Sequence, residues 1–241
     1  MNLYFVRHGQ SANNAAWDAS GNSNNRVEDP ELTEIGQHQA RSVAQFLARS
    51  GNSAPASGRD HHNRFGFGIT HVYTSLMVRA VATGYVIAEE LGLPLIAWED
   101  WHEAGGIYLH DPLSGEKIGL PGKPRSYFER CFPRLVLPAH LDEQGWWNRP
   151  FEDEAARHQR AQRAYAELLA RHGGRNDNVV IVSHGEFFNV FMAELLGCNA
   201  IGDWWFTLNN ASISRLRFEN ENEVQIVYLN RVDFLSDALI T

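Results

Sequence analysis

Residues 3–11, LYFVRHGQS, begin with a short apolar segment that stops at an arginine and His8. A second segment of this kind, VVIVSHGE at 179–186, stops at His184. Short apolar runs followed by polar, glycine-containing segments predict buried strands that deliver residues to loops. One His-Gly pair after a strand is typical of a turn with a packed histidine. Two copies, one behind an arginine, favour a shared functional site.

The pattern around these two segments predicts alternating strands and helices. Strands are expected at 3–6, 69–74, 95–98 and 179–182, helices at 34–50, 78–91, 152–172 and from about 186, and a hairpin from 212–218 and 224–229. This alternation predicts an α/β fold, a three-layer α/β/α sandwich in which a mostly parallel sheet has an antiparallel edge. Ligands of such sheets bind outside the carboxyl ends of the strands, where both His-Gly pairs are expected.

The whole chain, 1–241, is expected to form a single domain. Residues 104–150 are rich in glycine, proline and aromatic residues and are interpreted as an inserted cap. Residues 9–25 have the polar composition of a loop. Residues 51–68 lack periodicity and are expected to form a surface loop to which no role is assigned.

Composition narrows the class of protein. The net charge of −8 and the pI near 5.7 leave no basic footprint, which argues against nucleic acid or an anionic membrane as partner. No apolar run reaches the roughly 18 residues of a membrane span, and no signal-like segment precedes residue 7. We therefore expect a cytoplasmic protein without disulfides. The oligomeric state stays open, and a homodimer is compatible with the sequence.

Neither a metal nor a cofactor is expected. The chain has 11 histidines, but it contains no His-Glu-x-x-His or Cys-x-x-Cys pair, and His61 and His62 lie in the predicted loop. A nucleotide-dependent oxidoreductase would place Gly-x-Gly-x-x-Gly after the first strand, and that motif is missing there.

Five ordered segments resemble the histidine phosphatase superfamily, the phosphoglycerate-mutase-like proteins of branch 1. They are RHGQS at 7–11 with Asn14, LTEIG at 32–36 with Gln39 and Ala40, Thr74-Ser75 with Arg79, Ala80 and Thr83, the segment 180–185, and Asn210-Ala211-Ser212. The resemblance covers nearly the whole chain. It implies a small phosphorylated substrate and a transient phosphohistidine on His8.

The resemblance also implies roles that physical chemistry supports. Arg7 and Arg79 would bind the transferring phosphoryl group, since a guanidinium stays charged and forms paired hydrogen bonds to phosphate. These two cations and a cationic His184 would lower the pKa of His8 and keep its imidazole neutral for attack. The phosphate-binding set is expected to be Arg7, Ser11, Asn14, Arg79, His184 and Gly185. Ser11 and Asn14 are equally typical of ordinary turns.

Glu103 is the expected proton donor to the leaving group, because its segment, WHEAGG at 101–106, is similar to the family segment that holds the acid. Neighbouring tryptophans could raise the pKa of Glu103 by desolvation. The competing carboxyl groups are Glu99, Asp100, Asp111 and Glu186. Five basic residues of the expected cap could contact a second anionic group or be solvated, namely Lys117, Lys123, Arg125, Arg130 and Arg134. Three tryptophans could line an apolar wall of the site or pack in the core of the cap, namely Trp17, Trp146 and Trp147.

The sequence favours a phosphomonoester hydrolase. A mutase, which returns the phosphoryl group to a substrate, is the alternative, but residues 15–27 and the surroundings of Trp146 depart from the pattern of the glycolytic mutases. A non-catalytic interaction module of the same fold is disfavoured, because all five proposed catalytic residues are present, namely Arg7, His8, Arg79, Glu103 and His184.

Overall fold

The computed structural model describes residues 1–22, 26–50, 60–198, 204–220 and 223–241. Its main sheet has the strand order β6-β3-β2-β7-β1-β8-β9. The strands are β1 (Asn2–Arg7), β2 (His71–Thr74), β3 (Leu95–Ala97), β6 (Leu135–Val136), β7 (Asn178–Ser183), β8 (Ile213–Asn220) and β9 (Glu223–Arg231). Strands β6, β3, β2, β7 and β1 run parallel, and β8 pairs antiparallel with both β1 and β9. The predicted parallel sheet with an antiparallel edge is confirmed.

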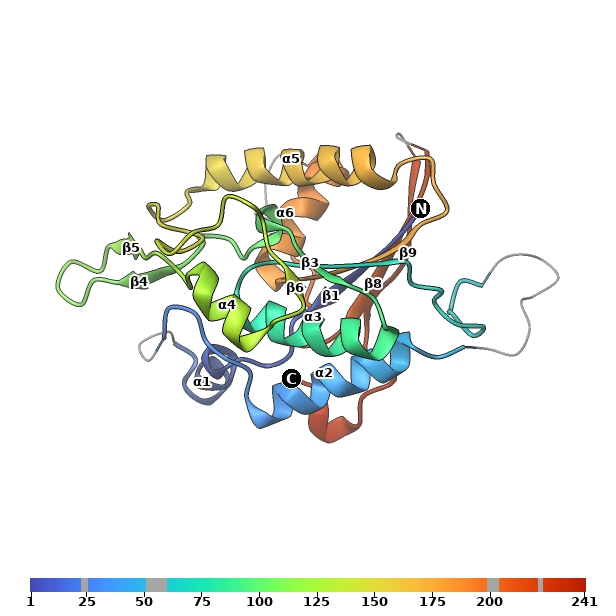
Figure 1. The fold of residues 1–241 in the computed structure, drawn as a ribbon, viewed down its shortest axis with the longest axis horizontal. Coiled ribbons are helices and arrows are strands. Elements are labelled where there is room, and N and C mark those ends of the chain that lie inside the picture. Colours follow the sequence, from blue (N-terminus) through green and yellow to red (C-terminus); the bar gives the residue numbers. More distant parts are fainter. Residues whose placement is uncertain (23–25, 51–59, 199–203, 221–222) are drawn as a thin grey trace.

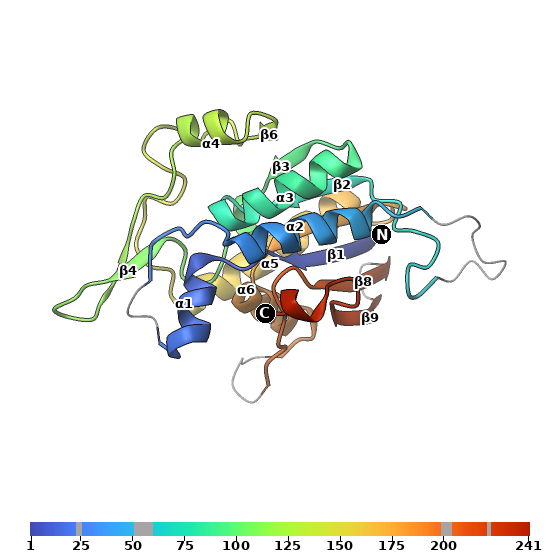
Figure 2. The same ribbon diagram turned by 90° about the horizontal axis from the view of Figure 1, so that it is seen from below.

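Helices cover both faces of this sheet (Figures 1 and 2). Helices α2 (Glu34–Leu47) and α3 (Val78–Leu91) lie on one face, and α5 (Glu154–His172) and α6 (Gly185–Leu195) lie on the other. Alternate residues of β1 supply the two cores, because successive side chains of a strand point to opposite faces. Tyr4 and Val6 pack with the α2–α3 side, whereas Leu3 and Phe5 pack with the α5–α6 side. The predicted three-layer sandwich is therefore confirmed.

The prediction that residues 9–25 are all loop is wrong, because helix α1 (Ala12–Ser20) lies within them. Ser11 caps this helix and its side chain accepts from the backbone of Asn14. No residue of α1 is buried, and Trp17 is 56% exposed. A helix without a buried apolar stripe leaves no periodic signal in the sequence.

Residues 104–150 hold a separate two-stranded sheet, β4 (Tyr108–His110) with β5 (Lys117–Gly119), and helix α4 (Arg125–Cys131). They also hold strand β6, which pairs with β3 in the main sheet. The expected cap therefore needs one correction, because part of this range is the edge of the sheet. Two short 3-10 helices, η1 (Glu99–Trp101) and η2 (Asp237–Leu239), complete the described elements.

The predicted surface loop at 51–68 is only partly exposed where it is described. Residues 51–59 lie outside the described residues. In the remainder, Phe67 is 3% exposed and belongs to the core, and the Asn63 side chain donates to the Tyr4 hydroxyl at 2.8 Å. This part of the segment is anchored because its polar and apolar groups contact β1.

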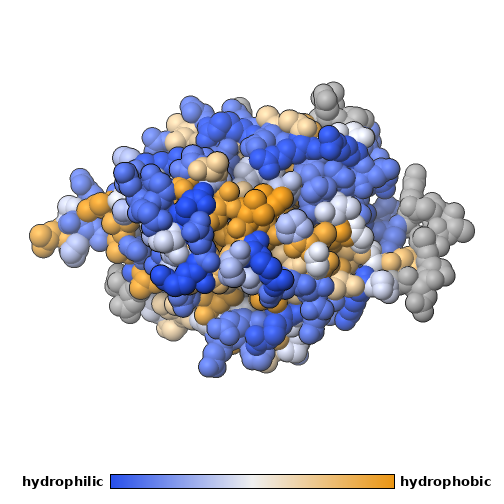
Figure 3. All heavy atoms as spheres, viewed as in Figure 1, coloured by the Kyte–Doolittle hydropathy of each residue, from blue (hydrophilic) through white to orange (hydrophobic). Residues whose placement is uncertain are grey.

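Helix boundaries differ slightly from prediction, and the helix expected at 34–50 ends at Leu47. Within the described residues, no helix is both long and apolar enough to cross a bilayer. On the face seen in Figure 1, hydrophobic side chains gather near the middle and hydrophilic ones surround them (Figure 3). Val136 of the edge strand β6 is 50% exposed.

Candidate active site

Strand register brings the two His-Gly pairs together. In the parallel pairing of β1 with β7, Arg7 lies opposite Ser183, so that His8 and His184 leave the sheet side by side. Their ring centroids are 5.0 Å apart. Strand β2 pairs with the other side of β7, and Ser75 follows it directly. The three strands thus end at one edge, as the sequence predicts.

The His8 ring is buried and its tautomer follows from its partners. Nδ1 donates to the Gly9 carbonyl at 2.7 Å, and Nε2 accepts from Arg79 Nε at 3.1 Å. The pKa of His8 is well below its usual value because the ring is buried and because Arg79 and Arg7 repel a further positive charge. This direction agrees with the expected neutral imidazole, with burial as the larger cause, and the Nε2 lone pair faces the Arg79 guanidinium.

The backbone that carries His8 is held by contacts from distant segments. The His8 carbonyl accepts from the Ala211 N–H and from Asn210 Nδ2, both at 3.1 Å. The Gly9 N–H donates to Thr83 Oγ1 at 3.0 Å. These residues belong to segments whose pattern resembles the superfamily, and the structure gives them a positioning function.

Asp29 is a site residue that the sequence did not indicate. It forms an ion pair with Arg79 at 3.8 Å and accepts from the Val78 N–H at 3.0 Å. Burial raises the pKa of Asp29 to about 6, although Arg79 opposes the shift, and burial lowers the pKa of Arg79 to about 10. Asp29 therefore anchors the guanidinium that contacts His8.

Arg7 is held through its end group, while its Nε is buried without a hydrogen-bond partner among the described residues. One terminal nitrogen donates to the Leu208 carbonyl. A Cβ at position 185 would lie 3.5 Å from Arg7 Nε, so Gly185 is in close contact with this arginine. The start of α6 therefore lies next to this cation.

His184 differs in charge from the prediction. Its Nε2 is 2.7 Å from Ser75 Oγ, and its Nδ1 is buried without a partner among the described residues. Burial, followed by Arg79 and His8, lowers the pKa of His184 well below its usual value. This direction disagrees with the expected cationic His184 and favours a neutral ring in the free protein. Ser75, which orients the ring, was within a matched segment but was not predicted as a site residue.

Ser11 and Asn14 form a capping box at the amino end of α1. Asn14 Oδ1 accepts from the Ser11 N–H at 3.0 Å and from Ser11 Oγ at 2.8 Å. Asn210 Nδ2, which also holds the His8 carbonyl, lies 3.3 Å from the same oxygen. These contacts link α1 to the His8 loop, and the phosphate-binding role of the two residues stays a prediction.

Glu103 lies where the amino end of α6 meets the loop after η1. Its Oε1 accepts from the Ala104 N–H at 2.9 Å and from the Phe187 N–H, in the first turn of α6, at 2.8 Å. Burial lowers the pKa of both Arg7 and Arg79, and the charge of Glu103 opposes both shifts, so Glu103 acts on the same cluster. The nearby Trp101 packs in the core against Phe187.

The competing carboxyl groups have other partners. Glu99 pairs with His140 at 2.7 Å, Asp100 with Arg163 at 3.5 Å, and Glu186 with Arg157 at 2.7 Å, while Asp111 accepts from the N–H groups of Leu113 and Ser114 at 2.9 and 2.8 Å. Glu186 is the nearest rival. Burial raises its pKa, and the charge of the neighbouring Glu103 raises it further. The position of Glu103 favours it, because its charge acts on both Arg7 and Arg79.

Most of the predicted cap side chains pack or pair locally. Arg125 pairs with Glu129 at 3.1 Å, Arg134 pairs with Glu89, and Lys123 and Arg130 lie over the Tyr127 ring at 5.3 and 5.8 Å. Trp146 and Trp147 are buried against His102, with centroids 5.6 and 4.7 Å from its ring. Of the alternatives for these tryptophans, packing in a core is confirmed.

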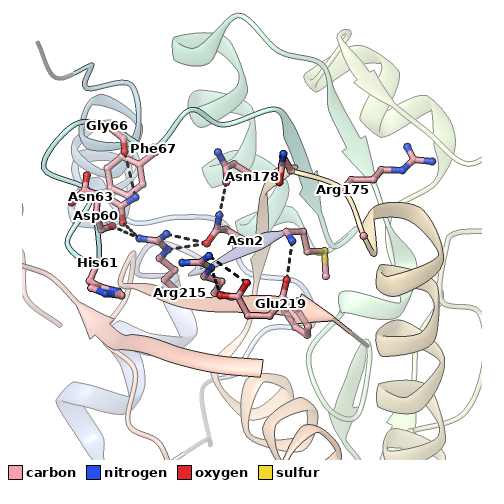
Figure 4. Close-up of a pocket in the computed structure, with 15 residues that line it drawn as sticks. Asn2, Asp60, His61, Asn63, Gly66, Phe67, Arg175, Asn178, Arg215 and Glu219 are labelled. Carbon is pink, nitrogen blue, oxygen red and sulfur yellow. Dashed lines mark hydrogen bonds and ion pairs between the residues drawn. The ribbon is translucent and has the colours of Figure 1, made fainter. Parts of the chain in front are cut away.

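A polar cavity of about 420 Å³ lies at the opposite edge of the sheet, where β1 begins (Figure 4). Two of its three arginines are already paired: Arg215 donates to Asn2 Oδ1 at 3.0 Å and to the Asp60 carbonyl at 2.7 Å, and Arg217 contacts Glu219 at 2.7 Å. The His8 cluster is the stronger candidate for an anion, because buried nitrogen atoms of Arg7 and His184 have no hydrogen-bond partner among the described residues.

Comparison with known proteins gives relatives over nearly the full length. The chain is 28% identical over 219 residues to the "Probable phosphoglycerate mutase GpmB" of Serratia proteamaculans, covering 90% of this chain and 84% of that protein. It is 29% identical over 231 residues to phosphoserine phosphatase 1 of Hydrogenobacter thermophilus, covering 95% and 92%.

Solved structures share the fold. A mycobacterial glucosyl-3-phosphoglycerate phosphatase matches with a TM-score of 0.58 and 18% identity, covering 96% of this chain and 99% of that one. The Entamoeba histolytica phosphoserine phosphatase matches with a TM-score of 0.59 and 20% identity, covering 98% and 99%. The sequence profile of the histidine phosphatase superfamily (branch 1) matches residues 3–59 and 120–231. With these matches and two histidines side by side at the ends of β1 and β7, the chain belongs to the histidine phosphatase superfamily, branch 1.

Proposed function

We propose that the protein is a phosphomonoesterase that hydrolyses a small phosphorylated metabolite through a phosphohistidine on His8. The observation that carries this proposal is the neutral, buried His8 ring, whose Nε2 lone pair faces the guanidinium of Arg79. A phosphoryl group in transfer spreads negative charge over its oxygens, so fixed cations beside a nucleophile are the main catalytic requirement.

In the first step, His8 Nε2 attacks phosphorus and the bond between phosphorus and the ester oxygen breaks. The Arg79 N–H that donates to Nε2 then donates to a phosphoryl oxygen instead. The leaving oxygen takes a proton from Glu103. Arg7, His184 and the backbone at Gly185 bind the other phosphoryl oxygens, with Ser11 and Asn14 beside them. Arg7 Nε and His184 Nδ1, which have no hydrogen-bond partner in the described part of the chain, support these assignments.

In the second step, the Glu103 carboxylate takes a proton from a water molecule, whose oxygen attacks phosphorus and displaces His8. The bond between His8 and phosphorus breaks, inorganic phosphate leaves, and Glu103 is protonated again. We propose that neither step uses a metal or a cofactor. Residues 104–134 and 137–150 act as the cap of one domain, and the cytoplasmic location and a homodimer remain predictions.

A mutase is the second candidate, supported by the Serratia relative's name. A mutase would need the same histidines and arginines, so the site geometry does not separate the two activities. We favour hydrolysis because the Hydrogenobacter relative is named a phosphatase and covers more of the chain. Release of inorganic phosphate from a panel of phosphate esters, without bisphosphoglycerate and with or without EDTA, tests this choice. Isomerisation without phosphate release would overturn it, and loss of activity in EDTA would overturn the metal-free mechanism.

Glu103→Gln provides a test of the acid. The amide keeps an oxygen for the N–H groups of Ala104 and Phe187 but cannot deliver a proton to the ester oxygen. We expect kcat for an alkyl phosphate to fall by about 10²–10⁴-fold, and kcat for p-nitrophenyl phosphate, whose phenolate leaves unassisted, to fall much less. Equal losses for the two esters would reassign the acid, with Glu186→Gln as the comparison.

A further inference from the structure

The Arg26 guanidinium stacks on the Tyr108 ring of strand β4, with its central carbon 4.3 Å from the ring centroid. Lys117 Nζ lies 5.6 Å from the same centroid and 4.3 Å from that of Phe151. Among the described residues, neither cation has a carboxylate within 4.0 Å. Arg26 Nε is also buried without a hydrogen-bond partner in the described part of the chain. An added anion would satisfy this N–H and pair with the guanidinium charge.

Arg26 lies beside the His8 cluster on the side of Glu103, since the charges of both Arg26 and Glu103 act on Arg79. Arg26 precedes Asp29, the partner of Arg79, by three residues. Burial lowers the pKa of Arg79, and the positive charge of Arg26 lowers it further. A Cβ at position 105 would lie 2.9 Å from Tyr108 Cε1, so the ring packs against the loop that carries Glu103. The leaving group of a phosphate ester bound at His8 would extend toward Glu103 and therefore toward Arg26.

The acidic groups nearby do not neutralise Arg26. Glu186 pairs with Arg157 at 2.7 Å, and Glu103 accepts from two backbone N–H groups. The planar fork of a guanidinium binds a carboxylate or a phosphate through two parallel hydrogen bonds, and stacking on an aromatic ring fixes its orientation. Tyr108 thus holds Arg26 in place for an anion of either kind.

We propose that Arg26, stacked on Tyr108, binds a second anionic group on the leaving-group part of the substrate, with Lys117 adding positive charge from the cap. This inference rests on the proposed function for the position of the leaving group. It makes Arg26 a specificity-determining residue and makes the substrate class phosphate esters that carry a further carboxylate or phosphate.

Matched ligands separate the two anions. Phosphoserine and phosphoethanolamine differ by a carboxylate, and propane-1,3-diol bisphosphate and its monophosphate differ by a phosphate. Binding is measured by calorimetry in the His8→Asn background, which removes turnover, and kcat/KM is measured in the active protein. We expect the protein to prefer the member with the second anion in at least one pair, and Arg26→Gln to reduce that preference by ~10- to 100-fold.

Arg149→Gln is the control, because Arg149 stacks on another cap ring, Trp147, at 4.0 Å. It should leave the preference unchanged, whereas Arg26→Lys should retain part of it. No preference in either pair, or a preference that survives Arg26→Gln, would overturn the inference. The proposed function fails separately, if the active protein releases phosphate neither from these esters nor from p-nitrophenyl phosphate. In that case the binding measurement still decides the role of Arg26.

Discussion

His8 shows how much of the chemistry depends on surroundings supplied by distant residues. The sequence predicts the direction of its pKa shift from Arg7 and Arg79, but the larger cause, burial, is visible only in the fold. Asp29 was not predictable, because an acidic residue before a proline in a loop has no pattern that marks it. Only the folded chain shows that its carboxylate reaches both Val78 and Arg79.

Asp29→Asn tests this buried ion pair at a pH well above 6, where the Asp29 carboxyl is ionised. The amide still accepts from the Val78 N–H but leaves Arg79 without a counter-charge. We expect the free energy of unfolding to fall by about 3 kcal/mol, because a buried cation loses its partner. Inorganic phosphate should stabilise the variant more than the wild type, since it supplies the missing negative charge.

Urea unfolding with and without phosphate provides the measurement. Glu89→Gln is the control, because its partner Arg134 is exposed, and an exposed pair should contribute about 1 kcal/mol or less. Equal stability of Asp29→Asn and wild type would contradict the buried ion pair, as would an equal response of the two proteins to phosphate.

At the scale of elements, periodicity predicts those that bury an apolar face and misses those that do not. Helices α2, α3 and α5 and strands β1 and β7 were predicted because each packs on the core. Strand β6 has two residues and exists through its pairing with β3, so no local pattern indicates it. The loop after β1 is fixed by α2, because the Thr33 N–H donates to the Gln10 carbonyl at 2.9 Å and Gln10 N–H donates to Gln39 at 2.7 Å.

Gly36→Ala tests this contact between α2 and the His8 loop. A Cβ at position 36 would lie 2.1 Å from the Gln10 carbonyl oxygen, which is too close for backbone to accommodate without a shift. We expect a loss of about 2 kcal/mol in the free energy of unfolding and a loss of activity as the loop moves. Gln37→Ala, at an exposed position of the same helix, is the control. Wild-type stability and activity in Gly36→Ala would show that α2 does not position the loop.

At the scale of the molecule, a protein of net charge −8 brings the buried Arg79, His8 and His184 together where β1 and β7 end. His8, His102 and His184 are all buried, with pKa values well below 6.5, so they remain neutral in the folded state. The unfolded chain protonates these rings below pH 6.5, and the protons it gains favour unfolding. Asp29 opposes this effect, because its raised pKa lets the folded state bind a proton that the unfolded chain does not. This stabilises the folded state as pH falls from about 6 toward 3.8.

We therefore expect stability to fall as pH decreases below 6.5. Each neutral buried histidine contributes up to about 1.4 kcal/mol per pH unit, and three histidines outweigh Asp29 and Glu186, the two carboxyl groups among the described residues whose pKa is raised. His8→Asn should reduce the slope by that amount, whereas His38→Asn, at an exposed position of α2, should not. Urea unfolding across the acid range measures the slopes. Stability that is constant or rises on acidification would contradict neutral buried rings.

The most direct measurement is the identity of the phosphorylated residue during turnover. Trypsin cleavage after Arg7 and Arg26 releases residues 8–26, in which His8 is the only histidine. Phosphoenzyme quenched in alkali, which preserves phosphohistidine, should yield this peptide with one added phosphoryl group, and His8→Asn should yield none. Steady release of phosphate with this peptide unmodified, or with the phosphoryl group on the peptide that holds His184, would contradict nucleophilic attack by His8.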